Sequence, residues 1–116
     1  MERRDEGELR LLALDGYLDA HTAPSFENAI EEEMRSGKIR LVVECSKLTY
    51  ISSAGLGVFM SFIEEIREAG GDIKLAGIPP KVYQVFEVLG FPALFDIVET
   101  TEAAAAKFAE GGRRED

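Results

Sequence analysis

Strand-like and helix-like segments alternate along this chain, and this order constrains its fold more than any other feature. Residues 39–45 alternate apolar and polar side chains, as a strand with one covered face does, and residues 73–77 repeat the pattern. Between these two strands, residues 54–69 carry apolar side chains at helical spacing and end at Gly70-Gly71. A helix that joins two strands in this way is typical of a right-handed crossover between parallel neighbours. The sequence therefore predicts an α/β fold.

The segments on either side of this unit extend the alternation. Further strands are predicted over residues 9–14, which end at the turn signal Asp15-Gly16, and over residues 95–98. Because the two crossover strands alternate rather than being apolar throughout, one face of the sheet should stay partly open. We expect a small α/β sandwich, in which a largely parallel sheet of four to five strands has helices packed mainly on one face. The other predicted helices begin at Thr22, Pro80 and Thr101, and they end at Gly37, Gly90 and Gly111.

The length and composition of the chain fit one domain with its own core. It has 116 residues, of which 46% are apolar, and that fraction is too high for an intrinsically disordered chain. No linker or internal repeat divides the sequence. We therefore expect a single domain over residues 1–116, with a core over about residues 9–110. The charged residues 1–7 and the C-terminal residues 111–116 lack the core pattern, so both ends are expected to fray.

Charge and cysteine content restrict the partners and the compartment. The formal net charge is −9, which argues against nucleic acid and anionic membranes as the main partners. A protein with a basic surface is the natural complement. Cys45 is the only cysteine, so no internal disulfide can form, and the cytoplasm is the default compartment. No apolar run approaches the length of about 18 residues that spans a bilayer, and we expect no secretory leader.

The segment with the strongest functional signal is YISSAGLG at residues 50–57. It follows a predicted strand and precedes a predicted helix, so Ser52 and Ser53 lie in a strand-to-helix loop. A phosphate on Ser53 would meet unpaired N–H groups and the positive end of the helix dipole. Such a modification adds a charge of about −1.5 to −2, which makes the segment a candidate switch. The alternative is an ordinary serine N-cap without further function.

Other kinds of chemical site find little support in the sequence. A hydrolase triad could consist of Ser53, His21 and Asp19, but the G-x-S-x-G pattern of a nucleophile elbow is absent. One histidine and one cysteine, far apart in the chain, are too few ligands for a metal site. The pair Gly55 and Gly57 lacks the third glycine of a dinucleotide loop and the lysine of a phosphate-binding loop. We therefore expect no catalytic residue, no metal and no cofactor.

The predicted helix after Ser53 has two features that each allow two explanations. Gly55 and Gly57 each cost roughly 1 kcal/mol relative to alanine within a helix. They permit either close packing of the helix on the sheet or the approach of a partner protein to the Ser53 backbone. Val58 and Phe62 lie four residues apart, off the main apolar stripe. They either pack on a neighbouring helix or form an exposed apolar patch for a partner.

Taken together, three segments of the chain resemble the STAS family, the bacterial anti-sigma-factor antagonists. The family's first loop, a Gly-x-Leu-Asp followed shortly by Thr, has its counterpart in LDGYLDAHT at residues 14–22. Its phosphorylation loop, the most specific of the three, resembles LTYISSAGLG at residues 48–57. Its third unit resembles GDIKLAG at residues 71–77 together with the helix that follows. The resemblance extends over residues 9–108, nearly the whole chain.

The resemblance implies that a partner serine kinase, an anti-sigma factor that uses ATP and Mg²⁺, phosphorylates Ser53. The unphosphorylated antagonist binds this kinase and frees a sigma factor, phosphorylation ends the binding, and a serine phosphatase restores it. The family usually has Asp directly before the phosphoserine, where this chain has Ser52. Because both loops follow strands of one parallel unit, they should emerge at one edge of the sheet and form one contact surface. The residues expected at that surface are Asp19, His21, Thr22, Ser52, Ser53, Gly55, Leu56, Gly57, Val58 and Phe62.

Two other functions stay open as alternatives. In a STAS-like adaptor that never switches, such as the small cytoplasmic subunit of a lipid-transport complex, Ser53 would only cap a helix. An enzyme with an unfamiliar site would show turnover by the isolated chain. The short, charged segment before Leu9 also predicts that the family's first edge strand is truncated or absent.

Overall fold

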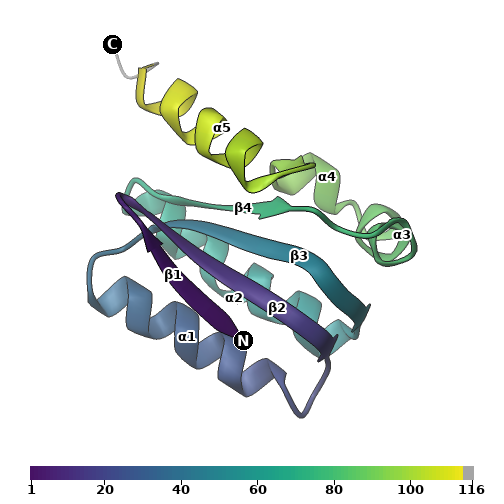
Figure 1. Cartoon of the computed structure of the whole chain (residues 1–116). Coiled ribbons are helices and arrows are strands. Elements are labelled where there is room, and N and C mark those ends of the chain that lie inside the picture. The colour runs from purple at the N-terminus through teal and green to yellow at the C-terminus, as the bar shows by residue number, and fades with distance from the viewer. Residues whose placement is uncertain (114–116) are drawn as a thin grey trace.

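Five strands form one mixed sheet, in which their spatial order follows their order in the chain (Figure 1). The computed structural model describes residues 1–113. The first strand runs antiparallel to the second, and all other neighbours are parallel. The predicted α/β class with a largely parallel sheet is confirmed. The strands are β1 (Glu2–Glu6), β2 (Leu9–Leu18), β3 (Arg40–Ile51), β4 (Asp72–Ala76) and β5 (Ile97–Val98).

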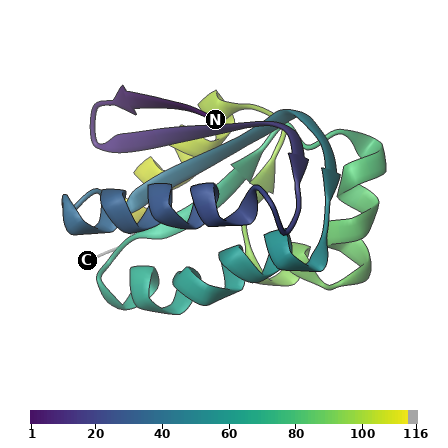
Figure 2. The ribbon, with the colours of Figure 1, turned by 90° about the horizontal axis from the view of Figure 1, so that it is seen from below.

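Helices cover one face of the sheet well and the other face only in part. Figure 2 shows α1 (Ala23–Arg35) and α2 (Ser53–Glu68) side by side on the first face. α3 (Pro80–Val88) and the short α4 (Phe91–Leu94) contribute to the core of the same layer. α5 (Thr101–Arg113) lies on the second face, over β3, β4 and β5. The carboxyl ends of β2 and β3 therefore stay open on the second face.

The main core lies between the sheet and the helices of the first face. Phe59 of α2 is at its centre and has no exposed surface. Its ring meets four other phenylalanine rings edge to face, with 5.2 to 6.1 Å between centroids. These contacts join α1, α2, α3 and α4 into one layer. The four partner rings belong to Phe26, Phe86, Phe91 and Phe95.

A smaller core on the second face of the sheet holds α5 in place. Lys74 of β4 lies at the edge of this core. The Nζ of Lys74 donates to Asp72 Oδ2 at 2.9 Å and to Asp96 Oδ2 at 2.7 Å, and it lies 4.6 Å from the centre of the Phe108 ring. Burial acts to lower the pKa of Lys74, but the two carboxylates outweigh it and hold the pKa above its usual value. Lys74 therefore stays charged beneath α5. The apolar side chains of this second core are Leu11, Val42, Ala76, Ala104 and Phe108.

The expectation that residues 1–7 fray is wrong, because β1 pairs with β2 as an antiparallel edge strand. All five side chains of β1 are exposed, and for this reason the segment shows no apolar alternation. Arg3 also reaches α1, where its guanidinium forms ion pairs with Glu32 at 2.9 Å and with Glu33 at 3.6 Å. The family's first edge strand is thus present in this chain, although its sequence is entirely charged.

Three elements extend beyond their predicted ends. β3, which was predicted to end at Cys45, continues to Ile51. β2 continues through Asp15-Gly16 and ends at Leu18. Gly16 has a φ of +79°, and the register with β3 shifts around it, so the predicted turn is a bulge within the strand. α5 likewise continues past its expected stop at Gly111. The predicted fraying of the last residues, 114–116, falls outside the described part of the chain.

Candidate functional site

The two loops predicted to share one edge of the sheet adjoin each other in the structure. Leu18, which ends β2, lies opposite Ile51, which ends β3. The backbone N–H of Ser52 donates to the carbonyl oxygen of Leu18 at 2.9 Å. The loop that begins at Asp19 and the loop that carries Ser52 and Ser53 therefore meet at the carboxyl edge of the sheet.

Asp19 organises the first of these loops. Its Oδ1 accepts hydrogen bonds from the N–H of His21 at 2.9 Å and from the N–H of Thr22 at 3.2 Å. Thr22 Oγ1 accepts from the N–H of Asp19 and donates to the carbonyl of Tyr17, both at 2.9 Å. Desolvation acts to raise the pKa of Asp19, but these donors outweigh it and hold the pKa below its usual value. The ionised carboxylate thus sets the shape of the loop.

Ser52 is the N-cap of α2, and Ser53 is its first helical residue. Ser52 Oγ accepts a hydrogen bond from the N–H of Gly55 at 3.4 Å. Ser53 is exposed to solvent. The N–H groups of the first helical turn have no acceptor within the helix, so the Ser53 hydroxyl lies at the positive end of the α2 dipole. The alternative in which Ser53 serves only as the cap is therefore wrong, because Ser52 has that role.

The position of Ser52 also explains how the chain departs from the family pattern. Serine and aspartate are about equally good N-caps. Replacing the usual aspartate with Ser52 therefore keeps the helix cap and removes one negative charge beside Ser53.

Gly55 is required by close packing. A Cβ at this position would lie 2.8 Å from the carbonyl oxygen of Leu18, 2.8 Å from the Cγ of Leu18 and 3.0 Å from Ile51 Cγ1. At Gly57, by contrast, a Cβ would meet no atom within 4 Å. The packing explanation thus holds for Gly55, while Gly57 is exposed on the same helix.

We predict that alanine at these two positions changes stability in opposite directions. Gly55→Ala should lower the free energy of unfolding by about 1 to 3 kcal/mol, because the new methyl group collides with the backbone of β2. Gly57→Ala should raise it by about 0.5 to 1 kcal/mol, because alanine favours the helix and has room there. Urea unfolding of both variants measures the difference. A Gly55→Ala variant as stable as the wild type would contradict the packing.

Four of the predicted surface residues are buried: Gly55, which packs against Leu18, and three residues of the core. Leu56 and Val58 are each 5% exposed, and Phe62 is 8% exposed. All three join the main core of the first face. The exposed apolar patch proposed for Val58 and Phe62 is therefore wrong, and packing within the domain is correct. The residues that remain accessible at the edge are Asp19, His21, Thr22, Ser52, Ser53 and Gly57.

The geometry does not arrange Asp19, His21 and Ser53 as a catalytic triad. Asp19 accepts from the backbone N–H of His21 rather than from its ring. Within residues 1–110, no hydrogen bond joins the His21 ring to Asp19 or to either serine. Cys45 is fully buried, and burial, together with the nearby Glu44 carboxylate, raises the pKa of its thiol. Neither the Ser53 hydroxyl nor the Cys45 thiol is therefore activated as a nucleophile.

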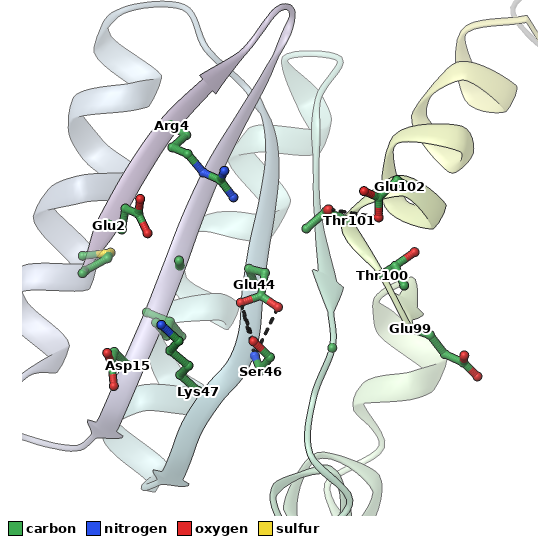
Figure 3. A pocket seen from close by; sticks show the side chains of 14 residues that line it. Glu2, Arg4, Asp15, Glu44, Ser46, Lys47, Glu99, Thr100, Thr101 and Glu102 are labelled. Carbon is green, nitrogen blue, oxygen red and sulfur yellow. Dashed lines mark hydrogen bonds between the residues drawn. The ribbon is translucent and has the colours of Figure 1, made fainter.

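A groove of about 690 Å³ opens on the second face of the sheet, between β1, β2, β3 and the start of α5 (Figure 3). Its walls carry more carboxylates than cations. At its floor, the hydroxyl of Ser46 donates a hydrogen bond to Oε1 of Glu44 at 3.0 Å. Small-molecule sites are usually lined by apolar and aromatic side chains. This charged groove therefore makes a weak candidate for such a site. Its charged side chains are Glu2, Arg4, Asp15, Glu44, Lys47, Glu99 and Glu102.

Sequence reasoning missed a pair of exposed tyrosines beside the two loops. Tyr17 on β2 lies opposite Tyr50 on β3, with 5.9 Å between ring centroids in an edge-to-face arrangement. Each tyrosine comes two residues before a loop residue of the site, Asp19 or Ser52. That equal spacing is visible in the sequence, but the pairing depends on the strand register. Across the part of the chain that the structure describes, no helix is both long and apolar enough to cross a membrane.

Comparisons with known proteins identify the family of the chain and agree with its fold. The STAS domain family model matches residues 1–104. BtrV of Bordetella bronchiseptica is 34% identical over 98 residues, which cover 84% of each chain. The anti-sigma-B factor antagonist of Listeria monocytogenes is 32% identical over 84 residues, 72% of this chain and 71% of that one.

Solved structures show the same fold. The anti-sigma factor antagonist SpoIIAA in its unphosphorylated form superimposes with a TM-score of 0.73 at 20% identity, covering 95% of this chain and 97% of that one. The phosphorylated form of SpoIIAA from Bacillus gives the same TM-score of 0.73 at 20% identity, over 92% and 97% of the two chains. From its family match and its relatives, this chain belongs to the STAS domain family and is similar to anti-sigma factor antagonists.

Proposed function

We propose that this protein is an anti-sigma factor antagonist whose binding is switched by phosphorylation of Ser53. In the unphosphorylated form it binds a serine-kinase anti-sigma factor, which then releases its sigma factor. The kinase uses ATP and Mg²⁺ to transfer the γ-phosphate to the Ser53 hydroxyl, which leaves ADP, and this ends the binding. A serine phosphatase restores the antagonist. The protein acts in the cytoplasm as a binding module and as a substrate, without a catalytic site of its own.

One observation carries this proposal: Ser53 is exposed at the first position of α2, on an edge that it shares with the Asp19 loop. A kinase can reach the hydroxyl without unfolding the helix, and the helix dipole favours the phosphate after transfer. The relative from Listeria, named an anti-sigma-B factor antagonist, supports the class of partner. SpoIIAA, of which both phosphorylation states have structures, supports the switch.

The proposal is tested by phosphorylation in solution. The wild-type chain, Ser53→Ala and Ser52→Ala are incubated with ATP, Mg²⁺ and serine-kinase anti-sigma factors from the same genome, and the site is read by mass spectrometry. We predict one phosphate on the wild type and on Ser52→Ala, and none on Ser53→Ala. Ser53→Ala should keep the wild-type stability, whereas Ser52→Ala should lose about 1 kcal/mol with the cap.

Two results would contradict the proposal. Phosphate that appears on Ser52 in the Ser53→Ala variant would show that the wrong serine has been assigned. A wild-type chain that takes up no phosphate from any of these kinases would favour a STAS adaptor that does not switch.

A further inference from the structure

Tyr17 and Tyr50 form an exposed aromatic pair on the open part of the second sheet face. Their side chains are 64% and 51% exposed. The following residues, Leu18 and Ile51, point into the core of the first face. Because successive side chains of a strand point to opposite faces, the two tyrosines project from the second face. α5 leaves this part of the sheet uncovered, so both rings face solvent.

Short backbone links hold this pair in a fixed position relative to Ser53. The carbonyl of Tyr17 accepts the hydrogen bond from Thr22 Oγ1 at 2.9 Å. Tyr50 lies in β3, three residues before Ser53, and the backbone N–H of Ser52 donates to Leu18 of the strand that carries Tyr17. The tyrosine pair therefore adjoins the Ser53 loop, within reach of a protein that docks there.

The size of a stable interface requires contacts beyond the two loops. Specific protein–protein interfaces bury about 800 Å² and roughly 20 to 30 residues on each partner. Only six of the residues predicted for the surface around Ser53 are accessible, so a bound kinase must cover neighbouring surface as well. Binding energy concentrates in a few residues, and tyrosine is among the types most enriched there. Tyr17 and Tyr50 are the exposed aromatic side chains that adjoin the edge.

The charge around the pair indicates what kind of surface fits it. The chain has a net charge of −9, and the groove on the same face has five carboxylates and two cations among its lining residues. A basic kinase surface is complementary to this region, and arginine guanidinium groups bind favourably over exposed tyrosine rings.

We propose that Tyr17 and Tyr50 anchor the anti-sigma factor kinase on the second face of the sheet, an inference that rests on the function proposed for Ser53. The kinase thus contacts the antagonist on two adjoining surfaces. The Ser53 edge presents the hydroxyl for phosphorylation, and the tyrosine pair supplies affinity that does not depend on the phosphate acceptor.

The test measures the affinity of the unphosphorylated chain for the kinase that phosphorylates it, by titration calorimetry in the presence of a nucleotide and Mg²⁺. Tyr17→Ala and Tyr50→Ala should each weaken binding at least about 30-fold, the loss that defines a strong anchor. Tyr17→Phe and Tyr50→Phe should retain most of the affinity, because the ring is kept. In the kinase reaction the alanine variants should raise KM for the antagonist and leave kcat nearly unchanged.

Leu94→Ala is the matched control, an exposed apolar residue at the other end of the molecule. Leu94 is 43% exposed, and its carbonyl accepts a hydrogen bond from Arg67 Nη2, near the C-terminal end of α2. α2 has 16 residues, a length of about 24 Å, and Ser53 lies at its opposite end. This variant should bind as the wild type does. Thermal melts of every variant show whether its fold is intact.

The results of these binding measurements distinguish the proposed tyrosine anchor from the proposed phosphorylation switch at Ser53. If the wild type binds and is phosphorylated while both alanine variants bind equally well, the anchor is wrong and the function stands. A loss as large for Leu94→Ala as for the tyrosine variants would also overturn the anchor. If the unphosphorylated wild type binds no such kinase, the proposed function fails, and the anchor fails with it.

Discussion

Phosphorylation of Ser53 is expected to weaken binding of the kinase by roughly 30- to 5,000-fold while leaving the domain folded. A phosphate on Ser53 adds a charge of about −1.5 to −2 to the contact with the kinase. This charge must be desolvated, and it faces a kinase surface that is complementary to a neutral hydroxyl. Burying an uncompensated charge at an interface costs on the order of 2 to 5 kcal/mol. At about 1.4 kcal/mol for each factor of ten, this cost gives the expected range.

The same phosphate should not destabilise the protein. Ser53 is exposed at the first position of α2, where the helix dipole and the free N–H groups of the first turn favour an anion. The melting temperature should therefore stay the same or rise slightly. Neither residue next to Ser53 in the chain, Ser52 or Ala54, carries a negative charge that would oppose the phosphate.

Calorimetric titration of both forms against the kinase, with thermal melts of each form alone, measures the two effects. Ser53→Asp should reproduce part of the loss, because it carries about half of the charge. Equal affinities of the two forms would reject the switch. A large drop in melting temperature on phosphorylation would instead show that the phosphate acts by unfolding the site.

Phe59→Ala is expected to lower the free energy of unfolding by about 3 to 5 kcal/mol, the largest loss that we predict for a single substitution. Phe59 has no exposed surface, and its ring contacts four other phenylalanine rings from α1, α3 and the α4 region. Truncation removes the burial of the ring and leaves a cavity among side chains that cannot all collapse into it. For a domain of this size, such a loss is a large part of its total stability.

Met60→Ala provides the matched control for this prediction, because the next residue of the same helix is 47% exposed. Its effect should stay within about 0.5 kcal/mol, as for most surface substitutions. Chemical unfolding of both variants gives the comparison. A loss of less than 1 kcal/mol in Phe59→Ala would show that Phe59 is not the centre of this core.

Within the described residues, the local pattern of the sequence was enough to predict four of the five strands and four of the five helices, all except β1 and α4. The periods of two and of 3.6 residues depend only on which side of each element is covered, and both are visible in residues 39–45 and 54–69. The meeting of the Asp19 and Ser53 loops was also predictable, because parallel strands bring their carboxyl ends to one edge. The acidic composition predicts a partner with a basic surface.

Only the tertiary structure decided which side chains are covered and which residues are neighbours across the sheet. β1 is entirely charged and forms a strand because the edge of β2 has free backbone groups to pair with it. Gly55 is indispensable because α2 starts against the carbonyl of Leu18, and Val58 and Phe62 are buried by neighbouring elements. Tyr17 meets Tyr50 only through the register that follows the bulge at Gly16. Register and packing join residues that are distant in the chain, and the local period of a sequence does not encode them.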